Sequence, residues 1–204
     1  QDGSTRSMIF GVAVLVSLAL GVPLGVFSSL HRGGWIDRLA RVFAIIGQAL
    51  PPFWLGLVLL LLFSVTWHVF PPGGNDGPSS FVLPAFTMSY FASAAIMRLT
   101  RSCMLDVLTT EYVKFARSKG LSETVVVWKH ALRNAVLPVI TYSVMLFVLF
   151  LGAAVVTESV FSWPGLGRLI LDSVNARDYP TVQAGVLIFS AIYMLANLLV
   201  DILY

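Results

Sequence analysis

The sequence predicts an all-α membrane protein with five transmembrane helices in a single domain over residues 1–204. The first observation is composition: 57% of the 204 residues are hydrophobic and only 11% are charged, whereas soluble domains carry about 25% charged residues. The second is that the apolar residues gather into long, nearly uncharged segments. The third is that the basic residues concentrate in alternate connections between these segments. A formal charge of +3 is too small to indicate a nucleic-acid partner.

Five apolar segments cover residues 8–30, 39–70, 82–97, 136–157 and 181–203. A hydrocarbon layer about 30 Å thick is crossed by about 20 helical residues, which fits the first, fourth and fifth segments. The second segment is too long for one straight helix, and Pro51-Pro52 should kink or break it. The third is short, but Arg98 and Arg101 can snorkel from its end, and the helix should continue through Asp106.

Two glycines in the first segment, Gly21 and Gly25, are four residues apart, with Pro23 between them. This spacing of small residues lets two membrane helices approach closely. It predicts close helix packing, with a flexible gate as the alternative.

The connections differ in their basic residues. Those over 31–41 and 98–135 hold ten Lys and Arg, whereas those over 71–81 and 158–180 hold two, Arg168 and Arg177. The positive-inside rule therefore predicts that the 31–41 and 98–135 connections are cytoplasmic. Residue 1 would then lie outside, so we expect another transmembrane helix upstream, and we expect a trimmed C-terminus as well.

A polar insert, EYVKFARSKGLSETVVVWKHALRNAVLP, covers residues 111–138 of this apolar chain. A helix should run from Glu111 to about Lys119, because an acid near the N-terminus and bases near the C-terminus suit the helix dipole. Gly120 is a natural residue for the end of that helix. The insert is therefore predicted to begin with a short helix and a glycine turn.

A second helix of the insert should follow, capped by Ser122 and ending near Asn134, before Pro138 opens the fourth segment. Three interpretations of the helical pair remain open. Its bases could merely set membrane topology. It has the outline of a DNA-binding helix-turn-helix, although both ends are tied to membrane spans. Apolar residues such as Trp128 on a water-facing loop favour the third, docking of a cytoplasmic partner.

The insert resembles the EAA loop of ABC-transporter permeases, in the version of the dipeptide/oligopeptide/nickel importer group. Further matches are GVPLGVFSSLHRGGWIDRLAR, QALPPFWLGLVLLLLF, RSCMLDVL, ESVFSWPGLGRLILDSVNARDYPTVQ and NLLVDILY. They cover nearly the whole chain, in the form of the first of the two permeases of such systems. The resemblance implies the type I ABC importer permease fold and a multi-pass protein of the bacterial inner membrane. Members usually have six spans, so this sequence would lack the first helix, the external segment that follows it and a short Asp-Pro-Arg tail.

The resemblance also implies partners. A second, homologous permease subunit would complete the translocation pathway, and two cytoplasmic ATPase subunits would hold ATP and Mg²⁺. An extracytoplasmic solute-binding protein would deliver the solute, and this chain would bind no cofactor itself. The solute would be a di- or oligopeptide, with nickel, glutathione or another small solute as the alternatives.

In this family the EAA loop forms the coupling helix that sits in a groove of the ATPase, which implies that role for the 111–135 loop. The residues to which the motif carries over are Glu111, Tyr112, Ala116, Arg117, Lys119, Gly120, Leu121 and Ser122. No glutamate lies four to six residues before Gly120, which departs from the general pattern and weakens the assignment of an ionic contact to Glu111.

Two further sets of residues are candidates for contacts with solute or partner. A polar residue or a broken helix at membrane depth is tolerated where it faces protein or a cavity. Candidates for the translocation pathway are therefore Gln48, Pro51, Phe53 and Trp54, with helix packing as the alternative. Candidates for contact with an external protein are Glu158, Trp163, Arg168, Asp172 and Arg177, with simple solvation of the acids as the alternative.

Catalysis by this chain is not predicted. The sequence has no Walker A pattern and no Ser/His/Asp, Cys/His or paired-carboxylate arrangement, as a membrane-bound hydrolase would need. One cysteine excludes an internal disulfide, and three histidines far apart along the chain predict no metal site. A stand-alone channel or secondary carrier is the alternative from another class, but charged residues inside spans or an inverted repeat, which would favour it, are not found.

Overall fold

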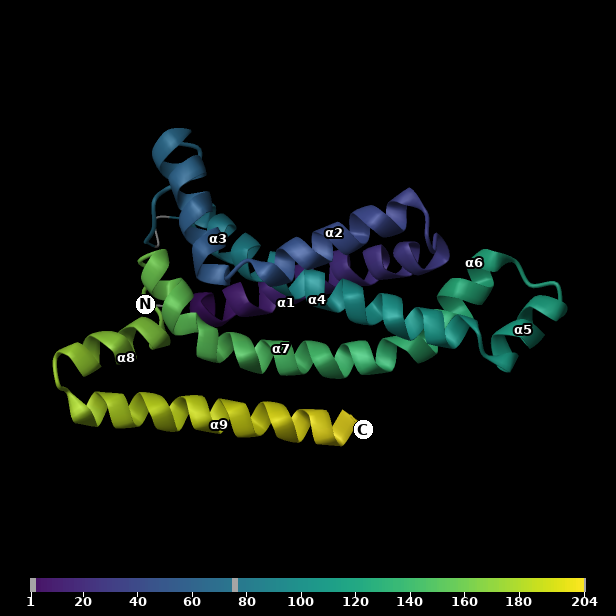
Figure 1. Cartoon of the computed structure of the whole chain (residues 1–204). Helices are drawn as coiled ribbons and strands as arrows, with labels where there is room; N and C mark the ends of the chain where they lie inside the picture. Colours follow the sequence, from purple (N-terminus) through teal and green to yellow (C-terminus); the bar gives the residue numbers. More distant parts are fainter. Residues whose placement is uncertain (1–2, 75–76, 204) are drawn as a thin grey trace. The chain divides into compact units, whose positions relative to one another are not determined.

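The structure, a computed structural model, describes residues 3–74 and 77–203 (Figure 1). The described residues are helical throughout, apart from short turns and loops. The main helices are α1 (Gly3–Leu30), α2 (Trp35–Ala49), α3 (Pro52–Leu59), α4 (Val82–Leu108), α5 (Glu111–Ser118), α6 (Glu123–Val125), α7 (Leu132–Val160), α8 (Leu166–Asn175) and α9 (Tyr179–Leu203). A π-helix, η1 (Leu60–Thr66), extends α3, a second, η3 (Val126–Ala131), joins α6 to α7, and a 3₁₀ turn, η2 (Pro78–Phe81), leads into α4.

The all-α membrane fold is confirmed. By length and composition four helices of the described chain can cross a membrane, Gly11–Leu30, Ser79–Leu108, Glu123–Phe150 and Tyr179–Leu198. The pair Trp35–Ala49 and Pro52–Thr66 is a fifth candidate, bent by 97° at the break between its halves. That break lies at Pro51-Pro52, as the sequence predicts. Pro51 is extended (φ −59°, ψ 133°) because the ring of a following proline disfavours helical backbone.

One predicted boundary is wrong. The second helix of the insert does not end near Asn134, and Pro138 does not open the fourth span. Helical backbone runs on from Glu123 through η3 and α7 to Val160, with Pro138 inside α7. Membrane helices tolerate an internal proline because neighbouring groups re-satisfy the freed backbone carbonyl. The insert and the fourth span are therefore one continuous helical run.

The chain divides into two compact units, each made from separate stretches of sequence. The first, here called the loop unit, contains Val16–Ala49 and Phe91–Ser143. The second, the α8–α9 unit, contains the preceding part of α1, Leu50–Tyr90 and the chain from Val144 onward. The two units are interleaved along the sequence and are described separately.

In the loop unit, α1 packs closely against α4 through its glycines. A Cβ atom at Gly21 would lie 2.8 Å from Cγ2 of Ile96, and one at Gly25 would lie 2.6 Å from Cβ of Thr100. The close packing predicted for Gly21 and Gly25 is confirmed. On α2, Ala40 and other small residues pack against α4, where Met97 is buried.

In the α8–α9 unit, α3 and the turn before α8 approach each other. A Cβ at Gly56 would lie 3.1 Å from the Phe161 ring, and the N–H of Gly74 donates to the carbonyl oxygen of Phe161 at 3.1 Å. The rings of Phe81 and Trp163 meet edge to face, with centroids 4.6 Å apart. Helix α8, which follows Trp163 closely in the chain, was not predicted from the sequence.

Candidate functional site

The predicted coupling loop forms an ordered helical pair. Helix α5 begins at Glu111 and ends at Ser118, and Gly120 follows with φ +76°, in the left-handed region where glycine carries no Cβ penalty. Ser122 takes the extended N-cap conformation before α6, but its side chain makes no capping hydrogen bond. The predicted first helix and glycine turn are therefore confirmed, whereas the predicted side-chain cap is not formed.

One side of the loop is buried against three helices of the loop unit. Val113 and Ala116 of α5, together with Val126, Val127 and Ala131 of η3, form an apolar cluster with Val26 of α1, Met104 of α4 and Ala135 of α7. Residues three apart share a helix face, which explains why Val113 and Ala116 both turn inward. This cluster, called here the loop core, anchors the helical pair to α1, α4 and α7.

Polar contacts tie the two helices of the loop together. The guanidinium of Arg117 makes two hydrogen bonds to the carboxylate of Glu123, at 2.8 and 3.3 Å, across the Gly120 turn. The hydroxyl of Tyr112 donates to the backbone carbonyl of His130. Glu111 pairs with Lys114 one turn later on its own helix, at 2.8 Å. Exposed pairs of this kind add little stability, so the loop core dominates.

The other side of the loop presents apolar side chains to its surroundings. Phe115 is 61% exposed, and the further exposed apolar residues are Tyr112, Leu121, Val125 and Trp128. The ammonium of Lys119 lies 4.5 Å from the centre of the Phe115 ring, a cation–π contact. Exposed aromatic residues beside cations are typical of protein interfaces. These five residues are called here the exposed loop face.

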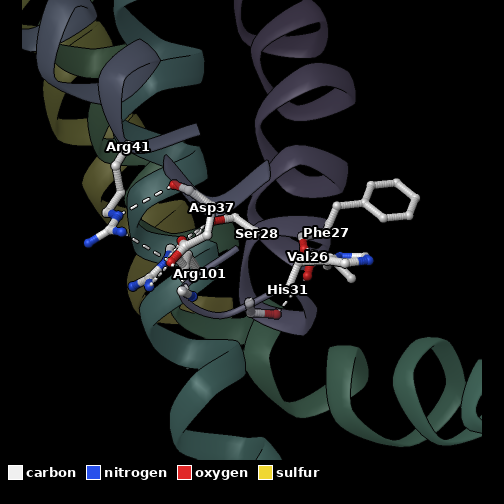
Figure 2. A network of polar contacts seen from close by, with 9 residues as sticks. Val26, Phe27, Ser28, His31, Asp37, Arg41 and Arg101 are labelled. Atoms are coloured by element: carbon white, nitrogen blue, oxygen red, sulfur yellow. Dashed lines mark hydrogen bonds and ion pairs between the residues drawn. The ribbon is translucent and has the colours of Figure 1, made fainter. Parts of the chain in front are cut away.

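Arg101 differs from its predicted role. Instead of snorkelling from the end of α4, its guanidinium contacts the carboxylate of Asp37 at the start of α2, with Nε 2.7 Å from Oδ1 (Figure 2). Asp37 is 1% exposed. Sequence reasoning missed this ion pair, which joins residues 64 positions apart.

The candidate pathway residues fall in both units. Gln48 belongs to the loop unit, and its Nε2 atom is buried with no hydrogen-bond partner among the described residues. A buried, unpaired amide costs free energy, and a pathway role for Gln48 remains a prediction. Pro51, Phe53 and Trp54 belong to the α8–α9 unit and are exposed there. Their pathway role remains a prediction.

Two of the candidate external-contact residues are buried. Glu158 is 7% exposed and its Oε2 accepts a hydrogen bond from the backbone N–H of Arg168 at 2.9 Å, in the first turn of α8. A carboxylate at a helix N-terminus is favoured by the helix dipole. Trp163 is also buried, against Phe81. Neither side chain is offered to an external protein in this structure, and the alternative of a simply solvated Glu158 is wrong.

Of the other three external-contact candidates, Asp172 and Arg177 are exposed and Arg168 is half-exposed. The guanidinium of Arg168 lies 3.7 Å from the Asp172 carboxylate on the outer side of α8. Arg177 follows that helix with φ +58°. The neighbouring Asp178 caps α9, and hydrogen bonds from the Thr181 hydroxyl and N–H hold the pKa of its carboxyl below the usual value. Contact of Arg168, Asp172 and Arg177 with an external protein stays a prediction.

An apolar groove of about 860 Å³ lies in the α8–α9 unit, lined by residues of α7, α8 and α9. Its few polar groups include Asn197, whose side-chain amide donates to the carbonyl of Tyr193 at 2.9 Å. Among the described residues, no group of three or more His, Cys, Asp or Glu side chains could hold a metal ion. The groove is suited to hydrocarbon rather than to a polar solute.

A family model described as "Binding-protein-dependent transport system inner membrane component" matches residues 21–204. The glutathione transport system permease protein GsiC of Salmonella typhimurium (strain LT2) is 43% identical over 192 residues, covering 94% of this chain and 63% of that protein. Its counterpart in Escherichia coli (strain K12) is 44% identical over 188 residues, covering 92% of this chain and 61% of that protein. The chain therefore spans less than two thirds of the length of these relatives.

Solved structures show the same fold at low sequence identity. An inward-facing structure of the MetNI methionine ABC transporter matches with a TM-score of 0.77 at 16% identity, covering 96% of this chain and 89% of that one. An amino acid ABC transporter solved with histidines matches with a TM-score of 0.68, also at 16% identity, covering 96% of this chain and 88% of that one.

Proposed function

This chain belongs to the family of binding-protein-dependent transport system inner membrane components, and from that premise we propose that it is a permease subunit of an ATP-driven importer. Its 111–135 loop docks the ATPase subunits. One observation carries the proposal: the loop has a rigid apolar attachment on one side, the loop core, and an unfilled apolar surface on the other, the exposed loop face. A loop that only sets topology by charge requires neither feature.

The mechanism follows from how the loop is attached. When ATP closes the two ATPases on each other, the docked loop moves with them, and the loop core transmits this motion to α1, α4 and α7. Packed helices move as rigid bodies, which produces alternating access on the two sides of a membrane. The driving difference between states comes from the ATPases. Their ATP and Mg²⁺ are not held by this chain, and its own contribution is mechanical.

The other subunits complete the pathway. A second, homologous permease forms its other half, and an extracytoplasmic binding protein supplies the solute to the side of α8 and the turn after it that carry Arg168, Asp172 and Arg177. A stand-alone channel or carrier would have no use for an anchored docking surface on its loop. These partners are part of the proposal.

The solute is proposed to be a small peptide. Relatives at 43–44% identity are named as glutathione transport permeases, and glutathione is itself a tripeptide, so it belongs to the same chemical class as di- and oligopeptides. Uptake by the reconstituted importer should therefore be measured with labelled glutathione, a dipeptide and Ni²⁺ in parallel. Uptake of Ni²⁺ alone would contradict a peptide substrate.

The docking role is tested by co-purification of the ATPases with the full-length permease. Phe115→Asp puts a charge in the exposed loop face without touching the loop core, because Phe115 points away from it. We expect at least about a tenfold loss of bound ATPase, as for removal of one interface anchor residue. Phe115→Leu, which keeps the surface apolar, is the matched control and should retain most binding. Wild-type levels of ATPase on Phe115→Asp would overturn the docking assignment.

A further inference from the structure

The Asp37 carboxylate is the centre of a buried polar network in the loop unit (Figure 2). Arg101 donates to both of its oxygens, from Nε at 2.7 Å and from Nη2 at 3.1 Å. The Ser28 hydroxyl donates to Oδ1 at 2.7 Å, and the Gly33 N–H donates to Oδ2 at 3.0 Å. Three segments meet at this carboxylate: the end of α1 with the turn after it, the first turn of α2, and α4.

The contacts identify Asp37 as an ionised, fully paired group. Four donated hydrogen bonds, two of them from one guanidinium, are what a carboxylate rather than a carboxylic acid accepts. The Nε of Arg101 also donates to the Ser28 hydroxyl at 3.1 Å, so Arg101, Ser28 and Asp37 are mutually bonded. The planar fork of arginine fits this arrangement, and the single charge of lysine would not reproduce it. Arg41 adds a longer contact of 3.5 Å from a half-exposed side chain.

Such a network needs a reason other than stability. Burying two charges costs desolvation free energy, and apolar residues of the same size often stabilise a fold as well or better. Breaking the pair by removing one partner is what destabilises, since it leaves a buried charge. The best-attested use of a buried ion pair is to fix the register of the elements that it joins. Here it joins the first turn of α2 to α4.

The network adjoins the loop core. Arg101 lies one helical turn before Met104, and Ser28 lies two residues after Val26; both Met104 and Val26 are fully buried members of the loop core. The ring of Phe27, which lies between Val26 and Ser28 in the sequence, meets the ring of Trp128 edge to face with centroids 6.3 Å apart. Contacts are therefore continuous from the docking loop through α1 and α4 to the Asp37 carboxylate.

We propose that Asp37 and Arg101 are positioning residues for energy coupling: they join α2 to α4 so that the movement of the docked loop also moves α2. The proposal rests on the proposed importer function. It adds that the movement of the loop reaches α2, the helix before the Pro51-Pro52 break, through this ion pair. Without the pair, α1 and α4 still follow the loop, but α2 is held to α4 only by apolar packing around Met97. It then follows less closely, and ATP is hydrolysed with less solute moved.

The first experiment uses the complete importer in proteoliposomes, with both permeases, the ATPases and the binding protein. Asp37→Asn keeps the shape of the side chain and removes its charge. We expect the ATPases to stay bound and the solute moved per ATP hydrolysed to fall about tenfold, within the range of coupling between sites. Arg101→Lys, which keeps the charge and loses the fork, should give a smaller fall. Arg38→Gln removes an exposed charge from the same connection and should leave the ratio unchanged.

The amount of solute moved per ATP hydrolysed, measured together with ATPase binding, distinguishes failure of this proposal from failure of the importer function. Asp37→Asn with bound ATPases and a wild-type ratio would overturn the role of the ion pair and leave the importer function standing. Loss of the ATPases from the wild-type chain would overturn the importer function itself.

A second experiment tests the premise that α2 moves with the loop, and it needs no variant of Asp37 or Arg101. Spin labels are attached to the otherwise wild-type complex at Arg38→Cys and Lys114→Cys, both exposed, with Cys103→Ala to remove the native thiol. A label pair across the ATPases reports that the ATP-trapped state has formed. The 38–114 distance should be the same with and without trapped ATP, because both labels belong to one body. A change as large as one helical turn, about 5 Å, would overturn the proposal.

Discussion

Replacement of Gly120 isolates the effect of backbone conformation on the docking loop. Its φ is +76°, and among the described residues no atom lies within 4 Å of where a Cβ would be. A side chain there meets open space, so the cost of Gly120→Ala arises from the left-handed backbone alone. For an L-residue this cost is about 1–2 kcal/mol.

The expected consequence is local opening of the loop rather than unfolding of the chain. A loss of about 1–2 kcal/mol multiplies the population of the opened loop about 5–30-fold. Amide hydrogen exchange of peptides from residues 111–125, measured on the full-length permease without ATPases, should accelerate by that factor. Gly120→Asn should exchange more slowly than Gly120→Ala, because asparagine tolerates the left-handed region. Gly33→Ala is the matched control: φ at Gly33 is +79°, again with open space around it, and exchange should rise only in its own turn.

Two results would refute this reasoning. One is unchanged exchange in Gly120→Ala, which would mean that the turn does not hold the loop in place. The other is much faster exchange in Gly120→Leu with unchanged exchange in Gly120→Ala. That result would mean that the bulk of the side chain matters and that the site is crowded. A bulky residue at Gly120 should abolish uptake while the subunit stays inserted. Because the space around a Cβ there is open, we expect alanine already to cause most of the loop opening.

Three further variants test packing and capping. Gly25→Ala should destabilise the purified protein by about 1–3 kcal/mol, seen as a lower Tm, because the new methyl group would lie 2.6 Å from Cβ of Thr100. Gly165→Ala should also lower the Tm, since its Cβ would lie 1.9 Å from Cδ of Glu158; in a Glu158→Ala background the same change should cost less, and strict additivity would argue against the contact. Asp178→Asn should lower the Tm by an amount that stays constant from about pH 8 to about pH 5, because the contribution of a carboxylate with a depressed pKa is fully present above its unfolded-state pKa. It is lost progressively as the pH falls from that value through the lower folded-state pKa. A difference in Tm between wild type and Asp178→Asn that disappears already near neutral pH would contradict the depressed pKa of Asp178.

The helices that the sequence predicted correctly are those whose signals are local. Long apolar runs, the Pro51-Pro52 pair and the Gly120 turn each act within a few residues, and the structure has a helix, a break and a left-handed turn at those positions. Pro138 misled the prediction, because a proline boundary rule that suits helices in water was applied at the edge of a membrane helix. Helix α8 was missed because its ten residues are too few to stand out beside the long spans. Gly165 and the Leu/Ile spacing after it were the available signal.

The long-range contacts of the site could not be predicted in the same way. The partner of Asp37 lies 64 residues away, and which side of α4 carries Arg101 toward α2 depends on helix rotation, which apolar packing decides. Glu158 was expected at the surface because acids near interfaces usually are; its burial depends on the return of the chain through Gly165 to form the first turn of α8. Both acids are held by donors that only the folded chain brings to them.

The loop residues that the family motif singles out perform different physical tasks. Ala116 is buried in the loop core, where a larger side chain would push α5 away from its support. Arg117 is engaged by Glu123 across the turn, and Tyr112 is bonded to the backbone of η3. Such residues shape the loop. Contact with a partner then depends on side chains directed outward, and among these Phe115 and Trp128 lie outside the motif residues carried over from the family. Recognition by the ATPase is therefore expected to depend on Phe115 and Trp128 as well as on the marked residues Tyr112 and Leu121, while the marked residues Ala116 and Arg117 hold the surface in shape.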